Sequence, residues 1–595
     1  MLPENGRRAT AAWTRMLPVV SLIVVGCAFG KMVELFVGGD DRDLRQRREG
    51  TPTRSPVRPG LLLLALDGMD RKLLYDMIER GDLPSFSKLI GGDDAGRAAK
   101  GKPAHATFAH AHFDDSMLST LPSTTIAAWV TAFTGAPPAV HGVTGNEFFL
   151  RPSGKFAAPV PVSFGDAVPV LKTYTDHYVD RLFSVPTVYE RMRKKDPNVR
   201  IWVAMSQVQR GADQLLVTRR SVVADAFAAF FEHDIPARVM QRDSKDVWAT
   251  LDANVVETVT EKLDDQAKPA ADVITVYLAG IDNYAHVAES GPDEARRVYL
   301  REVVDPLIEK LFAALAKRRE LDNRYVVVTS DHGHTQVLHD DAHALSTENS
   351  DDPPAVLERA GFRPRPFKLD VPDDDDFDSV LAYQGAMAFV YLADRSICPK
   401  KKQRCDYSRP PRFDEDVLVA AEAFFRTTHD GKYVPKMKGT LDMVLTRRPR
   451  PFEEKDLPFE VYVGGGRLVP VKEYLAANPH PTYVDVDERL RDLAEGRLGE
   501  RAGDVLLIAN NGNRDRPEQR YYFSFRYHSW HGSPSRQDSE VPLIVAHPHK
   551  TTEELAKIVK HALGARPYQQ KVTDLLLALR FDQHAPSPTP SHPKH

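Results

Sequence analysis

The chain has 595 residues, of which 42% are hydrophobic and 27% are charged, and its formal net charge is −4. This length exceeds what one ordinary core buries, so we expect a large catalytic domain with insertions, or two domains. The composition excludes a disordered chain, and the balance of charge provides no basic surface for nucleic acid. We therefore expect a globular protein that does not bind nucleic acid.

Residues 1–30 have the pattern of an export signal, because three arginines precede an apolar stretch of about 15 residues that is too short to span a membrane. The stretch ends in VVGC, which resembles a bacterial lipobox with Cys27 as the lipidated residue. A plain signal peptide or an uncleaved anchor is the alternative. Each predicts an exported protein, in the periplasm or bound to the membrane of a bacterial envelope, with this segment as its only membrane contact. Residues 31–59, charged and then rich in proline and glycine, are expected to be a linker.

Short apolar runs that alternate with helical patterns occupy residues 60–345 and return in residues 501–582. Helical patterns cover 71–82 and 293–320. We therefore predict an α/β fold, with a doubly wound and mostly parallel sheet and helices on both faces, in which ligands gather at the carboxyl ends of the strands. The runs that are typical of buried parallel strands are 61–66, 201–205, 273–278, 325–330, 505–509 and 542–546.

Residues 346–500 have a different rhythm, which predicts an inserted α+β subdomain. Strands are expected within 383–392, 440–448 and 461–471, with the glycine triplet of the last as a hairpin turn rather than a phosphate loop. Cys398 and Cys405 lie close together in the sequence, so in an exported protein we expect a local disulfide, and in a reducing compartment two free thiols. The proline-rich tail 583–595 is expected to be disordered.

Carboxylates and imidazoles gather where predicted strands end. Each alone is explained as a helix cap or a buried core histidine, but together they form a ligand set without thiolate that suits Zn²⁺. Six such ligands are too many for one tetrahedral ion, so we predict two divalent metal ions, a pairing that suits phosphoryl transfer. These residues are Asp67, Asp282, His286, Asp331, His332 and His531.

Five motifs in a fixed order carry a resemblance to a known family: LDGMD, PSTTIAAWVTAFTGAPPAVHGVTGN, DNYAH, SDHGH and WHG. With these motifs the chain resembles the alkaline phosphatase superfamily, and within it the branch of type I phosphodiesterases and nucleotide pyrophosphatases. The resemblance implies that Asp282, His286 and His531 hold one ion. It implies that the other is held by Asp67, Asp331, His332 and a threonine nucleophile.

The resemblance also divides the paired threonines. Alignment on Thr134-Gly135, His141-Gly142 and Asn146 places the nucleophile at Thr125 and leaves Thr124 as a helix cap or packing residue. Asn146 is then expected to bind a phosphoryl oxygen. The N–H groups at the start of the helix after Thr125 favour a bound phosphate as well. The implied activity is hydrolysis of a small phosphate ester or diester through a phosphothreonine intermediate.

Two residues depart from the family pattern, and two other functions stay open. Ala285 replaces a glycine, and Ile126 replaces an aromatic residue that stacks on a nucleobase in many relatives, which weakens the expectation of a nucleotide substrate. A phosphomonoesterase on the same site is the first alternative and needs a further cation, for which Arg151 and Lys155 are candidates. A non-catalytic envelope lipoprotein is the second alternative. No role is assigned to three polar residues beside the motifs, namely His334, His528 and Arg536.

Overall fold

The computed structural model describes residues 58–91, 108–216, 226, 244–347, 351–372, 375–398, 404–451, 457–512 and 516–581. The expected export signal with Cys27, residues 31–57 of the expected linker and the tail 583–595 lie outside these ranges. In the part of the chain that is described, no helix combines the length and apolar character that crossing a membrane requires.

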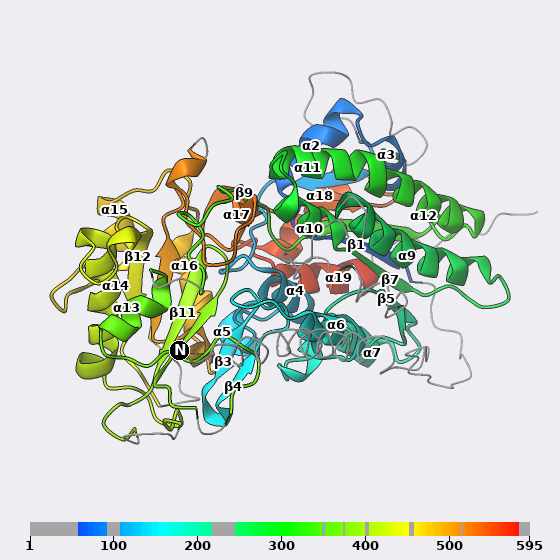
Figure 1. The fold of residues 1–595 in the computed structure, drawn as a ribbon. Helices are drawn as coiled ribbons and strands as arrows, with labels where there is room; N and C mark the ends of the chain where they lie inside the picture. Colours follow the sequence, from blue (N-terminus) through cyan, green and yellow to red (C-terminus); the bar gives the residue numbers. More distant parts are fainter. Residues whose placement is uncertain are drawn as a thin grey trace, which may run out of the picture.

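A seven-stranded sheet with the order β2-β17-β8-β1-β7-β5-β6 forms the centre of the larger lobe (Figure 1). β1 lies between β8 and β7 and is parallel to both, and β7, β5 and β6 continue in the same direction. The central strands β1, β7 and β8 are rich in apolar residues and almost completely buried, because helices cover both faces of the sheet. Their bounds are β1 Gly60–Leu66, β2 Ala111–Asp114, β5 Ile201–Ala204, β6 Gln214–Leu216, β7 Val273–Leu278, β8 Arg324–Ser330 and β17 Leu543–Ala546.

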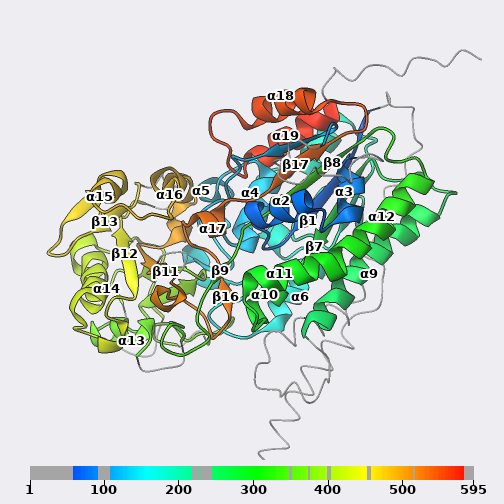
Figure 2. The same ribbon diagram turned by 90° about the horizontal axis from the view of Figure 1, so that it is seen from above.

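Two layers of helices enclose this sheet, and Figure 2 shows the strands between them. α9 and α12 lie in one layer, and α18 and α19 in the other. The doubly wound, mostly parallel α/β fold that the sequence predicts is therefore confirmed. The helices of this lobe are α2 Arg71–Arg80, α3 Pro84–Gly91, α4 Thr125–Thr134, α5 Pro138–His141, α6 Ala167–Thr175, α7 Val188–Lys195, α9 Ser244–Asp264, α10 Gly280–Val287, α11 Pro292–Tyr299, α12 Asp305–Lys317, α18 Thr552–Leu563 and α19 Lys571–Phe581.

A second, six-stranded sheet has the order β10-β11-β15-β12-β13-β14, and its paired strands are antiparallel. The glycine triplet 464–466 joins β13 to β14, with all three residues at positive φ, which glycine adopts without steric cost. Its strands are β10 Ser379–Tyr383, β11 Met387–Leu392, β12 Leu441–Thr446, β13 Glu460–Tyr462, β14 Leu468–Pro470 and β15 Val505–Ala509. Its helices are α13 Pro353–Arg359, α14 Leu418–Asp430, α15 Val471–Ala477 and α16 Val486–Ala494. A disulfide joins Cys398 to Cys405.

Two strand predictions are wrong in direction. The run 505–509 was predicted as a parallel strand of the core, but β15 lies between β11 and β12 in the antiparallel sheet, so the predicted boundary at residue 500 is also wrong. The run 542–546 does join the core, as β17, but antiparallel to β8 and β2. Both faces of β15 are covered: Leu506 and Ile508 enter one hydrophobic cluster, and the alternating residues enter the other. A strand buried on both faces has the same apolar pattern in either direction.

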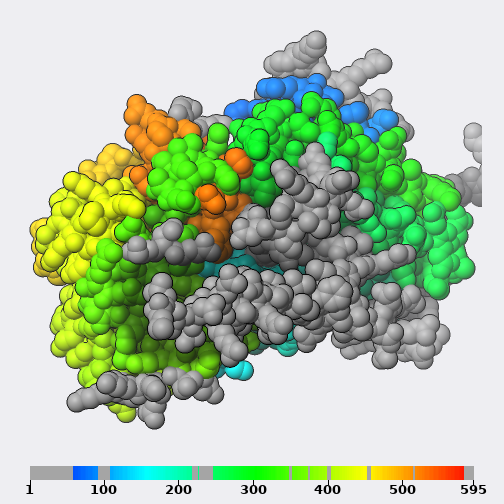
Figure 3. All heavy atoms as spheres, viewed as in Figure 1, coloured from blue at the N-terminus to red at the C-terminus, as the bar shows by residue number. Residues whose placement is uncertain are grey.

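The segment between the second sheet and β17 returns to the core along the junction of the two lobes. It forms β16 (Ser529–Trp530), which pairs antiparallel with β9 (Thr335–Gln336), and then α17 (Arg536–Ser539). Figure 3 shows this orange segment between the yellow residues of the second sheet and the green helices of the core. A residue of the late WHG motif is thereby brought next to the SDHGH motif.

Candidate active site

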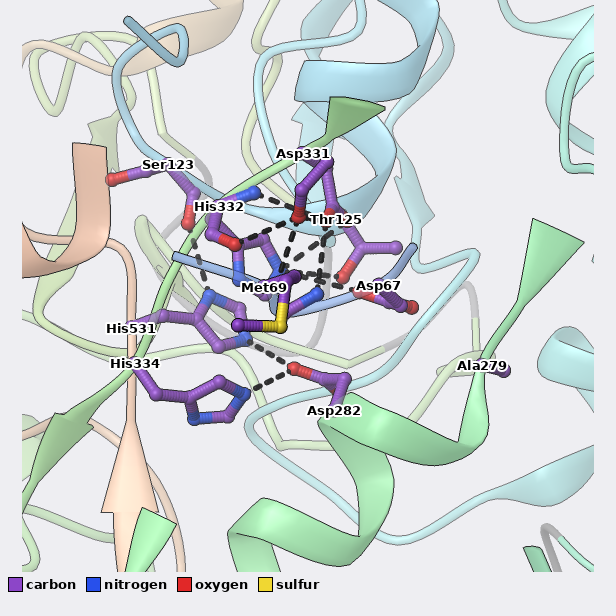
Figure 4. A network of polar contacts seen from close by, with 12 residues as sticks. Asp67, Met69, Ser123, Thr125, Ala279, Asp282, Asp331, His332, His334 and His531 are labelled. Carbon is purple, nitrogen blue, oxygen red and sulfur yellow. Dashed lines mark hydrogen bonds and ion pairs between the residues drawn. The ribbon is translucent and has the colours of Figure 1, made fainter. Parts of the chain in front are cut away.

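Three adjacent parallel strands deliver three carboxylates to one edge of the sheet. Asp67 directly follows β1, Asp331 directly follows β8, and Asp282 lies in the first turn of α10, just after β7. The last paired residues of these strands are in register, since Leu66 lies opposite both Ser330 and Leu278. The parallel topology therefore explains why residues 67, 282 and 331 meet (Figure 4).

The start of α10 is held by a buried carboxylate from α9. Asp252 accepts hydrogen bonds from the backbone N–H groups of Ala279 and Gly280, at 3.1 and 3.2 Å. Burial raises the pKa of Asp252 to about 7. Asp282 and His286 then lie one turn apart on the same face of α10, with His286 Nε2 3.4 Å from Asp282 Oδ2.

The first candidate metal group consists of Asp67, Asp331 and His332, whose ligand atoms lie within 4.8 Å of one another. His332 Nε2 lies 3.6 Å from Asp67 Oδ1 and 3.4 Å from Asp331 Oδ2. The hydroxyl of Thr125 joins this group, with its Oγ1 3.1 Å from the same nitrogen. A single imidazole nitrogen is thus surrounded by two carboxylates and one hydroxyl.

The second group consists of Asp282, His286 and His531, again within 4.8 Å of one another. His531 Nε2 lies 3.9 Å from Asp282 Oδ1. The rings of His531 and His332 stack with their centroids 3.6 Å apart, so the two groups are neighbours. The structure thus brings together all six carboxylate and imidazole residues predicted from the sequence, in the two sets that the family resemblance implies.

His286, His332 and His531 each direct the Nε2 edge of the ring toward the centre of the cluster. The Nδ1 atom of each lies 2.8 to 3.0 Å from a backbone carbonyl oxygen, of Gly333 for His332, of Ser529 for His286 and of Ser123 for His531. A carbonyl can only accept, so Nδ1 carries the proton and Nε2 of the neutral ring keeps its lone pair. Burial, helped by the neighbouring His332, holds the pKa of His531 well below its usual value and keeps this ring neutral.

The carboxylates of the first group are oriented in the same manner. Tyr277 donates to Asp67 Oδ2, and the N–H groups of Gly68 and His332 donate to Asp331 Oδ1 at 3.1 and 3.0 Å. The other oxygen of each, Asp67 Oδ1 and Asp331 Oδ2, is buried with no hydrogen-bond partner in the described part of the chain. Burial and the nearby Asp331 raise the pKa of Asp67 well above its usual value.

The donor set fits divalent cations. Lone pairs of oxygen and imidazole nitrogen converge, and burial of such acceptors and charges without a counterion is costly. Carboxylate and imidazole ligands with outer hydrogen bonds to carbonyls, amides and hydroxyls are typical of zinc and similar ions. The cluster can therefore hold a divalent metal ion.

The two threonines have different surroundings. Thr124 occupies the N-cap position of α4, one of the two roles expected for it, but its hydroxyl makes no capping hydrogen bond and is buried without a partner in the described residues. Thr125 is the first residue of α4 and lines a cavity. Asn146 lines the same cavity, and its Oδ1 accepts from the backbone N–H of Ile126 at 3.0 Å. Because Oδ1 is occupied, the Nδ2 donor of Asn146 is the atom left for a ligand.

The cavity beside Thr125 is small, with a volume of about 40 Å³, and its remaining walls are mostly apolar. Ile126 is fully buried and does not line it, so the aromatic surface of this site comes from other segments. Apart from Trp530, which belongs to the WHG motif, no motif in the sequence marks these wall residues. They are Val160, Pro161, Val162 and Phe164 from one segment, and Ser524, Phe525, Tyr527 and Trp530 from another.

Neither predicted cation faces this cavity. Arg151 is buried, pairs with Asp504 and donates to the carbonyl of Leu392 at 2.9 Å, while Lys155 is exposed on β4 (Lys155–Ala157). β4 pairs with β3 (Phe148–Leu150) at the lower end of the lobe in Figure 1. No lysine or arginine is found among the described residues that line the cavity.

Of the three polar residues left without a role, one belongs to the cluster. His334 Nε2 lies 2.7 Å from Asp282 Oδ1, and both residues are labelled in Figure 4. Together with His332 they form a third group whose ligand atoms lie within 4.8 Å of one another. In the sequence, only its position two residues after His332 indicates that His334 belongs to the cluster. His528 stacks on His339 with the ring centroids 4.5 Å apart, and Arg536 pairs with Glu540.

The second sheet holds two parts of the site through the turn between β10 and β11. Gln384 Oε1 accepts from the backbone N–H of Asn146 at 2.8 Å, and Gln384 Nε2 donates to the carbonyl of Glu147. The N–H of Ala386 donates to the carbonyl of His531 at 2.9 Å. The inserted region therefore positions residues of the site as well as flanking it.

Known proteins resemble this chain in sequence or in fold. The family model for type I phosphodiesterases / nucleotide pyrophosphatases matches residues 61–415. A variant of the alkaline phosphatase PafA is similar in structure, at 13% sequence identity and a TM-score of 0.52, over 89% of this chain and 96% of that chain. An inactive variant of murine ectonucleotide pyrophosphatase / phosphodiesterase 5, in complex with AMP, is 12% identical with a TM-score of 0.46, over 88% and 94% of the two chains. No curated protein shows significant sequence similarity to the chain.

Proposed function

Since the chain belongs to the type I phosphodiesterase / nucleotide pyrophosphatase family, we propose that it hydrolyses small phosphoric diesters through a phosphothreonine intermediate at Thr125. Enzymes of this family act on phosphoric ester bonds, and the chain is a hydrolase of that class. The observation that carries the finer proposal is the position of Thr125 Oγ1, 3.1 Å from His332 Nε2 and beside two groups of converging ligand atoms. A role as a helix cap alone does not explain why Thr125 lies beside these ligand atoms.

Two divalent ions, which we propose to be Zn²⁺, complete the site. Asp282, His286 and His531 hold one, and the other is held by Asp67, Asp331, His332 and Thr125. When bound, such ions lower the pKa of a hydroxyl or a water and stabilise negative charge on phosphoryl oxygens.

Hydrolysis then takes two displacements at phosphorus. In the first, Thr125 Oγ1 forms a bond to phosphorus while the bond to the leaving ester oxygen breaks, and the hydroxyl proton passes to that leaving oxygen, directly or through water. In the second, a water oxygen forms a bond to phosphorus while the phosphorus–Oγ1 bond breaks. One water proton restores the Thr125 hydroxyl, and the other ester group stays on the released phosphate monoester. Asn146 Nδ2 donates to a phosphoryl oxygen, and the N-terminus of α4 places further N–H groups and its dipole toward the same charge.

The cavity favours a diester over a monoester. A monoester brings an additional negative charge on phosphorus, and neither Arg151 nor Lys155 lines the cavity to meet it. The apolar walls suit a second ester group instead, and Phe164 and Phe525 are two of the surfaces it would contact. Phosphomonoesterase activity at the same site is therefore our second candidate.

Turnover of bis(para-nitrophenyl) phosphate and para-nitrophenyl phosphate, on protein of measured metal content, tests the proposal. We expect faster turnover of the diester, and a phosphate adduct on Thr125 in protein quenched with acid during turnover. Thr125→Ala is expected to lower diesterase activity at least about a thousandfold, while Thr124→Val serves as the matched control and keeps it. A zinc-loaded protein that turns over neither ester would favour the non-catalytic lipoprotein, and a preference for the monoester would favour the phosphatase.

We further propose that the protein is exported and anchored through Cys27. The disulfide between Cys398 and Cys405 supports export, because such bonds persist in oxidising compartments. Cell fractionation tests this: the wild-type protein is expected with the envelope membranes, and Cys27→Ser is expected to abolish lipid labelling. Recovery of the wild-type protein with the cytosol would contradict the proposal.

A further inference from the structure

His334 is a fourth imidazole in the cluster, and the resemblance to the family assigns it no role. It follows His332 by two residues and is fully buried at the start of the segment that leads into β9. Its Nε2 lies 2.7 Å from Asp282 Oδ1, closer than either His286 or His531 comes to that carboxylate. We propose that His334 is a direct ligand, through Nε2, of the metal ion held by Asp282, an inference that rests on the proposed binuclear site.

The hydrogen bonds around Ser529 show which nitrogen of His334 carries the proton. The hydroxyl of Ser529 donates to the carbonyl of Ala285 at 2.7 Å, and a hydroxyl has only one proton to donate. The contact of 3.0 Å between the same Oγ and His334 Nδ1 therefore needs the proton on Nδ1. In the neutral ring, Nε2 then carries a lone pair.

That lone pair faces a second acceptor. Asp282 Oδ1 is a carboxylate oxygen, so at 2.7 Å the contact needs either a metal ion close to both atoms or a second proton on the ring. Two lone pairs at this distance repel unless a cation lies close to both. The same arrangement, with Nδ1 bonded outward and Nε2 directed inward, is found for His286, His332 and His531.

Ser529 orients two imidazoles at once, which supports the same metal-binding role for both. Its carbonyl accepts from His286 Nδ1 at 2.8 Å, and its hydroxyl accepts from His334 Nδ1. Gly68 packs against the contact between His334 and Asp282. A Cβ added to Gly68 would lie 2.7 Å from His334 Nε2 and 2.8 Å from Asp282 Oδ1. Gly68 also has a positive φ of 67°, so a larger residue is excluded on two grounds.

The expected consequence is tighter retention of the ion. A catalytic zinc site keeps three protein ligands and one open position, whereas four protein ligands are typical of sites that hold zinc for structure. With Asp282, His286 and His531, His334 would supply the fourth; its ligand atom lies within 4.8 Å of those of Asp282 and His332. We therefore expect this ion to be the last one lost to a chelator, and His334 to be the reason.

Chelator competition on the full chain, with Zn²⁺ as the probe, tests the assignment. Wild-type protein is expected to bind two ions, and His334→Ala to bind one of them at least tenfold more weakly. Ser529→Ala, which removes only the hydroxyl, is expected to weaken the same ion to a smaller extent. The matched control is His528→Ala, a histidine of the same segment that stacks on His339 and lies outside the cluster, and its affinities should equal those of the wild type.

A second readout separates a ligand from a structural contact. Visible absorption of the cobalt-substituted protein reports the coordination of the ion, and we expect it to change in His334→Ala and not in His528→Ala. If His334 only pairs with Asp282, the melting temperatures of the metal-free and metal-loaded protein will fall by equal amounts and the cobalt spectrum will be unchanged. Either result overturns the inference. A wild-type protein that binds no ion refutes the proposed function instead, whereas two ions with an unchanged His334→Ala protein refute only this inference.

Discussion

Replacing Tyr277 with phenylalanine removes one hydroxyl from beneath the candidate site and leaves its ring in place. Tyr277 lies on β7 and packs against Trp129 and Tyr174, with ring centroids 6.0 and 5.9 Å apart. Its hydroxyl donates to Asp67 Oδ2 and, 3.2 Å away, contacts the hydroxyl of Tyr174. An ionised carboxylate only accepts, so Tyr277 must be the donor to Asp67 and the acceptor from Tyr174. The substitution therefore removes a side-chain donor that orients Asp67.

The size of the effect follows from this hydrogen bond. A bond to a charged group contributes about 1.5–3 kcal/mol, which corresponds to about 10- to 100-fold in an equilibrium constant. Loss of an outer hydrogen bond to a metal ligand typically lowers metal affinity over the same range. The hydrogen bond from Tyr277 also lowers the pKa of Asp67, against burial and Asp331, which raise it. Without Tyr277 that pKa rises further, so protons compete better with the metal and the loss of affinity is expected to grow as the pH falls.

Metal affinity is measured by chelator competition at two pH values, together with diesterase activity. The matched control is Tyr189→Phe, which removes another buried tyrosine hydroxyl, one that lies 2.9 Å from Thr275 Oγ1 on the same strand. We expect the control to keep the affinity of the wild type. Equal affinities of Tyr277→Phe and Tyr189→Phe at both pH values would refute the reasoning that the hydroxyl orients Asp67 for a cation.

Three further predictions concern residues around the site. Thr124→Val is expected to change the free energy of unfolding by less than about 1 kcal/mol, because the hydroxyl it removes is buried without a partner in the described residues; a large loss in denaturant unfolding would show a missing partner. Asp252→Asn is expected to flatten the dependence of stability on pH. Burial raises the pKa of Asp252 from 3.8 to about 7, so the folded state keeps a proton that the unfolded state loses, and wild-type stability falls as the pH rises through this window, by on the order of 4 kcal/mol. If the free energy of unfolding changed with pH by the same amount in both proteins between pH 4 and 7, the prediction would be wrong. Gln384→Leu leaves buried backbone groups of Asn146 and Glu147 without their partners, so we expect a loss of about 1–3 kcal/mol of stability and a lower kcat on a diester, measured at unchanged metal content; an unaltered kcat would show that the second sheet does not position Asn146.

Much of the larger lobe could be predicted from the sequence, because its strands are long apolar runs separated by helical patterns. The carboxylates after β1, β7 and β8 could be predicted as neighbours for the same reason, since parallel strands end at one edge of a sheet. Strand direction could not be predicted. β15 and β17 are as apolar as β1, and only their partners decide that they run antiparallel.

The details of the site depended on contacts between distant segments. Arg151 was a candidate cation beside Asn146, but it pairs with Asp504, more than 350 residues away, and does not line the cavity. Thr124 has the sequence context of a helix cap, yet its side chain turns to a position where no partner lies in the described residues. Spacing along the chain specifies neither a rotamer nor a partner from another element.

The sequence by itself determined the class of fold, the family and the chemical types of the ligand set, because hydrophobic periodicity and short motifs are local properties of the chain. Only the tertiary structure decided where the second sheet takes up β15, which walls surround Thr125, and that His334 faces Asp282. On the other side of the ring, His334 Nδ1 contacts the hydroxyl of Ser529, which is 195 residues away in the sequence. The group that hydrogen-bonds one ring nitrogen of a histidine sets the tautomer and the orientation in which the other nitrogen can bind a metal. Only the folded chain brings that group next to the ring.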